Sequence, residues 1–240
     1  MEIGVSIERA KELITTCKLN LSLETIHLDK ANGRILAKGL MSKVNDPRFD
    51  NSAMDGWAVK KEDCSSSNET ILRIVGEIRA GSESIHTINS GEACKITTGA
   101  PMPEGADAIV IVENSRIDGE NVIITGQAEE SFIRIKGENL SKGKLAIPEG
   151  TYMEPSTISL AATMGYDVIS VFRKPIIGII STGDELVMPN SEIKDWQIFE
   201  SNSFGIAALV EKIGGKPVRY GIVTDSVDQL RETMDDAVEN

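Results

Sequence analysis

The stretch 174-KPIIGIISTGDEL-186 joins a continuous apolar run to a Gly-Asp-Glu turn, which is typical of a parallel strand buried on both faces. A predicted helix follows at 201-SNSFGIAALVEKIGG-215, with a serine near its start and two glycines at its end. A second apolar strand, 216-KPVRYGIVTD-225, precedes a second helix at 226–240. This order predicts the start of a doubly wound α/β domain. Because so few strands cannot bury both faces of a sheet, we expect the chain to be part of a longer protein.

Upstream of this region the sequence changes character between residues 46 and 141. Short β-rich runs alternate with turns of Gly, Pro, Asn and Ser, and they predict a compact all-β domain. The runs are 71-ILRIVGEI-78, 92-EACKITTG-99, 107-DAIVIVE-113, 121-NVIITG-126 and 131-SFIRIKG-137.

Two further helices are predicted outside the β-rich region. In 6-SIERAKELITTC-17 the apolar side chains share one helical face, and Ser6 fits the N-cap position. That face consists of Ile7, Ala10, Leu13, Ile14 and Cys17. The second helix, in 154-EPSTISLAATMG-165, begins near a proline and ends at a glycine.

Composition limits the classes of partner and compartment. The formal net charge is −12, without a cluster of five basic residues, which makes nucleic acids and anionic membranes poor partners. The three cysteines are far apart, which favours a reducing compartment. No secretory signal and no membrane-spanning apolar stretch is visible. We therefore expect a cytoplasmic protein.

Three acidic residues follow the two predicted parallel strands. Asp184 and Glu185 come after the first strand and Asp225 after the second. Ligands of open parallel sheets bind beyond the carboxyl ends of the strands, where these carboxylates could bind a metal or orient a ribose or pterin. Each aspartate alone is better explained as a helix cap. Their matching positions favour a functional role for the group.

Two turns in the β-rich region also carry candidates. In 51-NSAMDGWAV-59, Asp55 is either part of a common Asp-Gly turn or a functional acid. Thr98 and Gly99 end a strand and could hold a phosphate or a pterin edge, although an ordinary β-turn explains them equally. Arg134 is a candidate anion partner, and Asn139 follows it in 134-RIKGENL-140.

Together these motifs resemble the molybdopterin molybdotransferase family (MoeA), to which the E domain of gephyrin is related. The matching stretches, in family order, are 50-DNSAMDGWAV-59, 97-TTGAPMPEGADAIV-110, 134-RIKGENL-140, 178-GIISTGDELV-187, 200-ESNSFGIAALVEKIGG-215 and 220-YGIVTDSVDQLRE-232. The resemblance implies insertion of molybdate into adenylylated molybdopterin with release of AMP, assisted by a divalent cation, usually Mg²⁺. It also implies a molybdopterin-adenylating protein as a possible partner.

The same resemblance implies a mixed, multi-domain fold. A discontinuous helical dimerisation domain (1–45 and 142–173) carries an inserted β-rich domain (46–141), and the start of a molybdopterin-binding α/β domain follows (174–240). Family members are elongated homodimers in which the β-rich domain of one subunit faces the α/β domain of the other. We expect the two helices outside the β-rich domain to hold this dimer.

Site residues are carried over by matching positions. They are Asp55, Glu185 and Asp225 as catalytic residues, Ser52, Thr98, Gly99, Arg134, Asn139, Thr182, Gly183 and Asp184 as substrate-binding residues, and Glu185 and Asp225 as metal ligands. Asn139 departs from the family, which usually has an acid there, and the family's later Gly-Gly-Val-Ser and Pro-Gly-Lys-Pro segments are not in this chain. Both departures keep open the alternative of a non-catalytic scaffold or partner-binding module.

Overall fold

The structure is a computed structural model that describes residues 4–16, 21–64, 69–82 and 86–239. Contacts between Cα atoms divide the chain into two compact units. The α/β unit comprises residues 1–38, 149–158 and 167–240, and the β-rich unit comprises residues 39–148 and 159–166. The domain boundaries expected from the family resemblance stay predictions.

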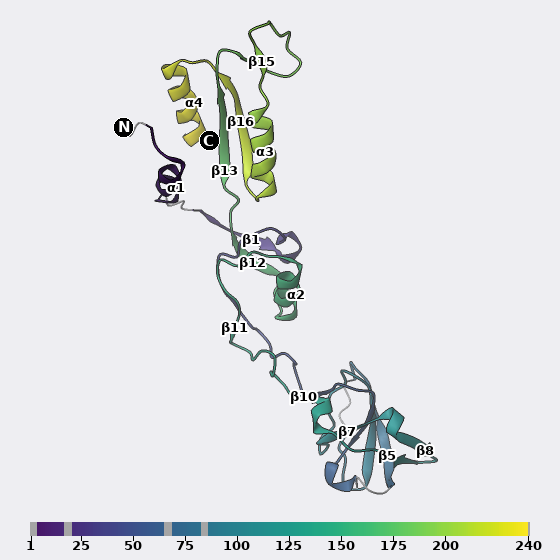
Figure 1. Ribbon diagram of the computed structural model, residues 1–240. Helices are drawn as coiled ribbons and strands as arrows, with labels where there is room; N and C mark the ends of the chain where they lie inside the picture. Colours follow the sequence, from purple (N-terminus) through teal and green to yellow (C-terminus); the bar gives the residue numbers. More distant parts are fainter. Residues whose placement is uncertain (1–3, 17–20, 65–68, 83–85, 240) are drawn as a thin grey trace. The chain divides into compact units, whose positions relative to one another are not determined.

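The α/β unit has two parallel strands at its centre. Strand β13 (Ile176–Thr182) pairs with β16 (Lys216–Val223), and α3 (Asn202–Lys212) connects them. Helix α4 (Val227–Glu239) follows β16, and α3 and α4 lie on either side of the two strands (Figure 1). This arrangement confirms the strand–helix–strand–helix prediction. A short parallel pair, β14 (Leu186–Val187) and β15 (Ile198–Phe199), lies between β13 and α3 in the chain.

Local chemistry explains where α3 begins and ends. Gly214 has a φ of +92°, a left-handed conformation that favours glycine and stops the helix. Ser201, the serine expected near the start of the helix, occupies the N-cap position, but its side chain makes no capping hydrogen bond. The Glu200 carboxylate instead accepts the N–H of Ser203 at 2.7 Å. The start of the helix was predicted correctly, and the structure identifies Glu200 as its capping group.

The α/β unit also contains an antiparallel pair that the sequence analysis did not predict. Strand β1 (Leu23–His27) pairs with β12 (Val168–Phe172), which follows α2 (Pro155–Thr163). The N-terminal helix α1 (Ile7–Thr16) begins as predicted, because the Ser6 hydroxyl accepts the Arg9 N–H at 3.2 Å. No residue of α1 is buried, and Cys17, predicted on its apolar face, lies outside the described residues.

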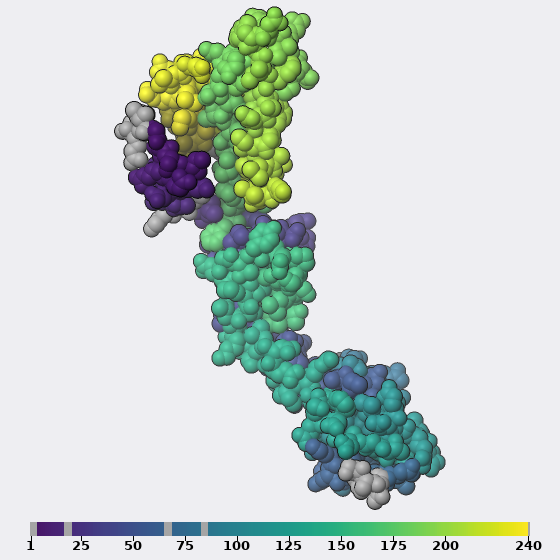
Figure 2. All heavy atoms as spheres, viewed as in Figure 1, coloured from purple at the N-terminus to yellow at the C-terminus, as the bar shows by residue number. Residues whose placement is uncertain are grey.

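The β-rich unit is built on a six-stranded sheet in the order β7-β4-β6-β5-β9-β8. Its strands are β4 (Gly56–Val59), β5 (Thr70–Ile78), β6 (Glu92–Ile96), β7 (Ala108–Ile111), β8 (Ser115–Asp118) and β9 (Asn121–Ile124). Strand β4, which lies between β7 and β6, is buried throughout, with Trp57 in one apolar cluster and Ala58 in another. Both faces of the sheet therefore pack against apolar side chains. In Figure 2 this sheet and its loops are the part coloured blue to teal.

Shorter pairs complete this unit. Strand β2 (Leu40–Met41) pairs with β11 (Leu145–Ile147), and β3 (Asn51–Ser52) pairs with β10 (Ile133–Arg134). The strand predicted over 131–137 is reduced to β10, because Glu130–Phe132 form a 3-10 turn. Similar turns occur at Leu28–Lys30, Lys61–Asp63 and Val112–Asn114. Within the described parts of the chain, no helix has the length and apolar character needed to cross a membrane.

Candidate functional site

The carboxyl ends of β13 and β16 meet at one edge of the α/β unit. Thr182 at the end of β13 is in register with Val223 at the end of β16. The Gly183 N–H donates to the Val223 carbonyl oxygen at 3.2 Å. In the loops beyond, the Asp184 carboxylate accepts the N–H of Asp225, also at 3.2 Å. The two aspartates therefore lie side by side, as expected for residues at the ends of neighbouring parallel strands.

Glu185 lies in the same loop and is folded back over Gly183. Gly183 has a φ of +145°, and a Cβ at this position would lie 2.6 Å from Oε2 of Glu185. Glycine therefore leaves room for this carboxylate. Among the described residues, no three His, Cys, Asp or Glu side chains gather closely enough to hold a metal ion. Within the part of the chain that the structure describes, Glu185 and Asp225 thus have no third protein ligand beside them, and their role as metal ligands stays a prediction.

Two cavities adjoin this edge. The larger, of about 420 Å³, lies between β13, β15 and the start of α3, and Ser181, Thr182, Ser201 and Asn202 line part of it. The smaller, of about 200 Å³, is lined in part by Thr182 and Asp225. Thr182 borders both cavities. The acidic edge therefore adjoins a space of the size that small ligands occupy.

Glu200 is a candidate that the sequence analysis missed. Its side chain is 2% exposed, and its carboxylate accepts hydrogen bonds from the N–H and hydroxyl of Ser203 and the hydroxyl of Ser181. Burial alone raises the pKa of Glu200, but these bonds and the Arg219 charge outweigh it and hold the pKa below its ordinary value. Glu200 is therefore ionised at neutral pH. The sequence feature that could have identified Glu200 is its position directly before the predicted start of a helix, where an acid is favourable.

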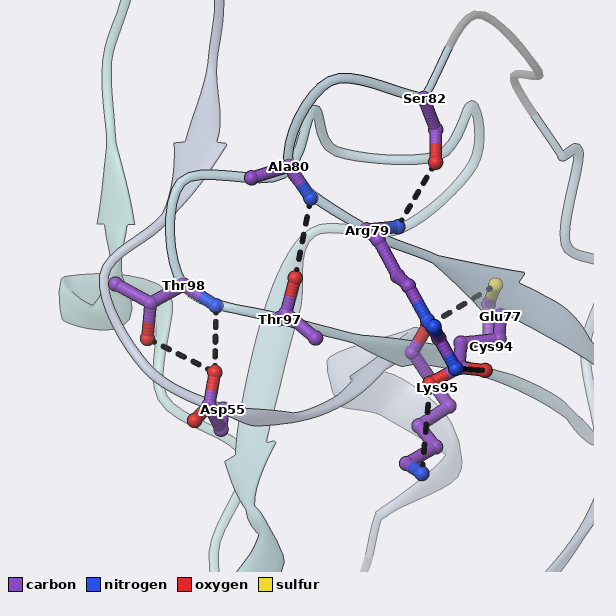
Figure 3. A network of polar contacts seen from close by, with 9 residues as sticks. All are labelled: Asp55, Glu77, Arg79, Ala80, Ser82, Cys94, Lys95, Thr97 and Thr98. Atoms are coloured by element: carbon purple, nitrogen blue, oxygen red, sulfur yellow. Dashed lines mark hydrogen bonds and ion pairs between the residues drawn. The ribbon is translucent and has the colours of Figure 1, made fainter.

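In the β-rich unit, Asp55 is held against Thr98 (Figure 3). Oδ1 of Asp55 accepts the backbone N–H of Thr98 at 2.7 Å and its hydroxyl at 3.0 Å. These two bonds, the backbone bond foremost, hold the pKa of Asp55 below its ordinary value. The other oxygen, Oδ2, has no hydrogen-bond partner within the described part of the chain. Asp55 thus presents an ionised, exposed oxygen that is open to a ligand.

Ser52 builds the turn that carries Asp55. Its hydroxyl donates to the Met54 carbonyl oxygen and accepts the Met54 N–H. Ser52 is 0% exposed, so its predicted contact with substrate would require the turn to open. The two interpretations of the motif are therefore compatible. Ser52 supplies the local bonds of the turn, which leaves the Asp55 carboxylate available to reach Thr98.

The two neighbouring threonines serve different partners. The Thr97 hydroxyl accepts the Ala80 N–H at 3.1 Å, whereas the Thr98 hydroxyl donates to Asp55 (Figure 3). Gly99 has a φ of +80°, and its N–H donates to the Ser52 carbonyl oxygen at 2.8 Å. The Gly99 N–H, which the sequence analysis considered as a donor to a phosphate, is therefore already hydrogen-bonded within the protein.

Asn139 joins two distant segments of the β-rich unit. Its Nδ2 donates to Oδ2 of Asp46 at 3.3 Å, and its backbone N–H donates to the Asp46 carbonyl oxygen at 3.0 Å. An acid at position 139 would face the Asp46 carboxylate without a proton to share at neutral pH. Arg134, the predicted anion partner, is exposed on β10 opposite Asn51.

The predicted site residues thus form two groups, one in each unit. Thr182, Gly183, Asp184, Glu185 and Asp225 belong to the α/β unit, and Ser52, Asp55, Thr98, Gly99, Arg134 and Asn139 belong to the β-rich unit. Their roles toward a substrate stay predictions.

Residues 5–165 match the family described as the MoeA N-terminal region (domain I and II). The chain belongs to the MoeA family. Residues 178–240, which include the acidic edge, β16 and most of β13, match a second family, described as a probable molybdopterin binding domain.

Two curated proteins that are similar to this chain carry the same enzyme name. A protein of Nostoc sp. (strain PCC 7120) named molybdopterin molybdenumtransferase is 38% identical over 221 residues, which cover 90% of this chain and 51% of the relative. A protein of Staphylococcus aureus (strain MSSA476) with the same name is 30% identical over 239 residues, which cover 98% and 57%. The chain spans about half the length of the curated relatives it matches.

Solved structures of MoeA proteins have the same fold. One molybdopterin biosynthesis MoeA protein from Pyrococcus horikoshii OT3 superposes with a TM-score of 0.89 and 31% identity, over 97% of this chain and 63% of that one. A second structure from the same species has a TM-score of 0.85 and 30% identity, over 98% and 61%.

Proposed function

We propose that this protein acts in molybdenum cofactor biosynthesis as a molybdopterin molybdenumtransferase, which inserts molybdate into adenylylated molybdopterin and releases AMP. The observation that carries the proposal is the placement of Asp184 beside Asp225, next to two cavities, in a chain of the MoeA family. The names of the relatives support this activity. The asparagine at position 139, where the family usually has an acid, had favoured the scaffold alternative. Its hydrogen bond to Asp46 explains the presence of an asparagine there by a structural role.

The larger cavity is suited to the pterin part of the proposed substrate. Apolar side chains such as Leu186 and Phe199 cover part of its wall, and the hydroxyls of Thr182 and Ser201 and the Asn202 amide supply uncharged polar groups. Pockets of this composition orient planar, hydrogen-bonding ligands through a few polar groups. In this arrangement, Asp184 and Asp225 would lie toward the reacting end of the substrate.

The negative charge of both substrates needs compensation. Molybdate and a diphosphate are anions, and a site built from Asp184, Glu185 and Asp225 alone would repel them. In the homodimer proposed below, Arg134 of the partner subunit would supply one positive charge. We also propose Mg²⁺, which commonly uses only one or two protein carboxylates and takes its other ligands from phosphates and water. Because the described residues hold no three-ligand site, Glu185 and Asp225 would be its protein ligands together with the substrate.

Bound in this way, the magnesium ion would neutralise the diphosphate and polarise the phosphorus for cleavage of the AMP linkage. The side chains of the chain have separate tasks. Asp184 is fixed by the Asp225 N–H, so this bond holds the two loops in one arrangement. Thr182 borders both cavities and can donate a hydrogen bond to a ligand that extends from one cavity to the other.

We further propose a homodimer in which Asp55 of one subunit serves the α/β unit of the other. Asp55 is ionised and exposed, and it belongs to a different unit from the other predicted acids. Ile7 and Ile14 on α1 are each 71% exposed, which offers an apolar stripe for association. Sedimentation at micromolar concentration tests this proposal, and a strict monomer near 26.0 kDa would contradict it.

The proposal also includes a setting and a partner. The reaction would take place in the cytoplasm, in keeping with the free thiols of Cys64 and Cys94. A molybdopterin-adenylating protein would be the partner, because the proposed substrate must first be adenylylated.

Complementation of a molybdenum-cofactor-deficient strain tests the activity. The gene carrying Asp55→Ala should fail to restore cofactor production, whereas the unchanged gene should restore it. Asp118→Ala, which removes an exposed carboxylate on β8 in the same unit, is the matched control and should complement normally. Undiminished cofactor production by Asp55→Ala would refute the role proposed for Asp55.

A further inference from the structure

A buried carboxylate forms part of the wall of the larger cavity. Glu200 lies between β15 and α3 and borders the space of about 420 Å³ together with Ser181, Ser201 and Asn202. It is the only acidic residue among the buried residues that the structure describes. Burying a charge is energetically costly unless hydrogen bonds and an opposite charge compensate it. The partners of Glu200 therefore indicate which parts of the structure its charge holds in place.

Those partners come from three elements. The Glu200 carboxylate accepts the hydroxyl of Ser181 on β13 at 3.1 Å, and the N–H and hydroxyl of Ser203 on α3, each at 2.7 Å. Arg219 on β16 lies 4.0 Å from the carboxylate and also donates to the Ser203 hydroxyl at 2.9 Å. Both oxygens of Glu200 are thus used within the protein. Glu200 is a positioning residue, because its oxygens hold residues of the cavity wall in place and do not contact a ligand.

The same contacts change the charge at the start of α3. A helix N-terminus normally offers free N–H groups and a partial positive charge to an anion. Here the Ser203 N–H is already bonded to a full negative charge, and the Arg219 guanidinium is packed 3.4 Å from the centre of the Phe204 ring. Because both oxygens of Glu200 are bonded within the protein, the groups of Ser201 and Asn202, which are uncharged, are the polar groups left for a ligand at this end of the cavity.

We propose that Glu200 sets the polarity of this cavity: it holds Ser181 and the first turn of α3 in place, and it reserves the α3 end for an uncharged, hydrogen-bonding ring while excluding phosphate. This inference rests on the proposed function, in which the ring is the pterin of molybdopterin. The anionic end of that substrate would then lie toward Thr182 and the acidic edge, where a cation can accompany it.

Calorimetric titration of the 240-residue chain with two probes tests the inference. The probes are unsubstituted pterin, which is uncharged near neutral pH, and inorganic phosphate, titrated at constant ionic strength. The unchanged chain should bind pterin saturably and show no saturable phosphate binding. Glu200→Gln removes the charge at nearly constant volume. It should weaken pterin binding by about tenfold, because Ser181 and the first turn of α3 lose the charged acceptor that holds them in place, and it should gain saturable phosphate binding.

Two variants control this comparison. Glu211→Gln makes the same chemical change at an exposed position of α3 and should behave like the unchanged chain. Glu200→Asp keeps the charge but shortens the side chain, so it should still exclude phosphate while binding pterin more weakly. Far-ultraviolet circular dichroism establishes that each variant is folded.

The outcomes separate the two proposals. A folded Glu200→Gln variant that binds both probes like the unchanged chain would overturn the role of Glu200. If Glu200→Gln does not fold, Glu200→Asp decides, since phosphate binding by that folded variant would overturn the inference equally. If the unchanged chain fails to bind pterin but the phosphate contrast appears, the proposed pterin site is wrong and the charge effect of Glu200 stands.

Discussion

Asp55 and Thr98 are joined by two hydrogen bonds that converge on one carboxylate oxygen. Oδ1 of Asp55 accepts the Thr98 N–H at 2.7 Å and the Thr98 hydroxyl at 3.0 Å. Because both donors stabilise the ionised form, they fix the orientation of the carboxylate and lower its pKa together. The Asp-Gly turn that the sequence displays thus presents an acid whose partner lies in a distant segment of the chain.

Replacing Thr98 with valine should raise the pKa of Asp55 toward its ordinary value of 3.8. Valine keeps the backbone N–H, which makes the larger contribution, so the change should be partial. A carboxyl-carbon NMR titration measures it. Thr97→Val is the control, because its hydroxyl bonds to Ala80 and should leave the pKa of Asp55 unchanged. An unchanged Asp55 pKa in Thr98→Val would show that the hydroxyl contributes nothing.

Glu200→Gln should destabilise the α/β unit by about 2–4 kcal/mol at pH 7, because it leaves the Ser181, Ser203 and Arg219 donors without a charged acceptor. The pKa of Glu200 is lowered in the folded protein, so its stabilising effect is present above its unfolded pKa of 4.5 and lost as the pH falls through the folded value. Urea unfolding, monitored by hydrogen exchange of the amides of β13 and β16, measures the difference in unfolding free energy between the unchanged chain and Glu200→Gln. This difference should shrink as the pH is lowered. A difference that does not change with pH would contradict this explanation.

Gly56→Ala should disrupt the buried strand β4 of the β-rich unit. A Cβ at Gly56 would lie 2.0 Å from the carbonyl oxygen of Val110 on β7, a contact that backbone movement must relieve. We expect a loss of more than about 3 kcal/mol in the free energy of unfolding. Thermal unfolding measures it, and a variant as stable as the unchanged chain would contradict the close β4–β7 approach.

The matched control for that change lies in α3. Apart from its chain neighbours and the adjacent backbone of its own helix, a Cβ at Gly205 would meet no atom within 4 Å. Gly205→Ala should therefore stabilise the α/β unit by roughly 0.5–1 kcal/mol, because alanine loses less backbone entropy in a helix. The same thermal unfolding experiment should therefore show an increase in stability for Gly205→Ala and a decrease for Gly56→Ala.

Asn139→Asp should destabilise the β-rich unit through repulsion from Asp46. The substitution replaces the Nδ2 donor, which lies 3.3 Å from Oδ2 of Asp46, with a second carboxylate. Since the pair is exposed, we expect a loss of about 0.5–1 kcal/mol at low salt, and a smaller loss at high salt. Urea unfolding at two salt concentrations measures the difference. Asn139→Ala removes the bond without adding charge, so its effect should vary little with salt.

Local patterns in the sequence determined most of the secondary structure of the α/β unit. The apolar runs predicted β13 and β16, and the glycines after residue 213 predicted the end of α3. Such features depend on neighbouring residues, because periodic burial and turn chemistry act over a few positions. The convergence of Asp184 and Asp225 was also predictable, since parallel pairing places strand ends together. The order of the motifs along the chain likewise indicated the MoeA family.

Only the tertiary structure decided which side chains meet. Asp55 and Thr98 are 43 positions apart, and Asn139 and Asp46 are 93 apart, so no local pattern pairs them. The pairing of β1 with β12 depends in the same way on a long chain closure. Glu200, and not the adjacent Ser201, caps α3 because Ser181 and Arg219, from other strands, stabilise the charge of Glu200 in a buried position. The sequence specified the acids and the turns, whereas packing between distant strands selected the partner of each carboxylate.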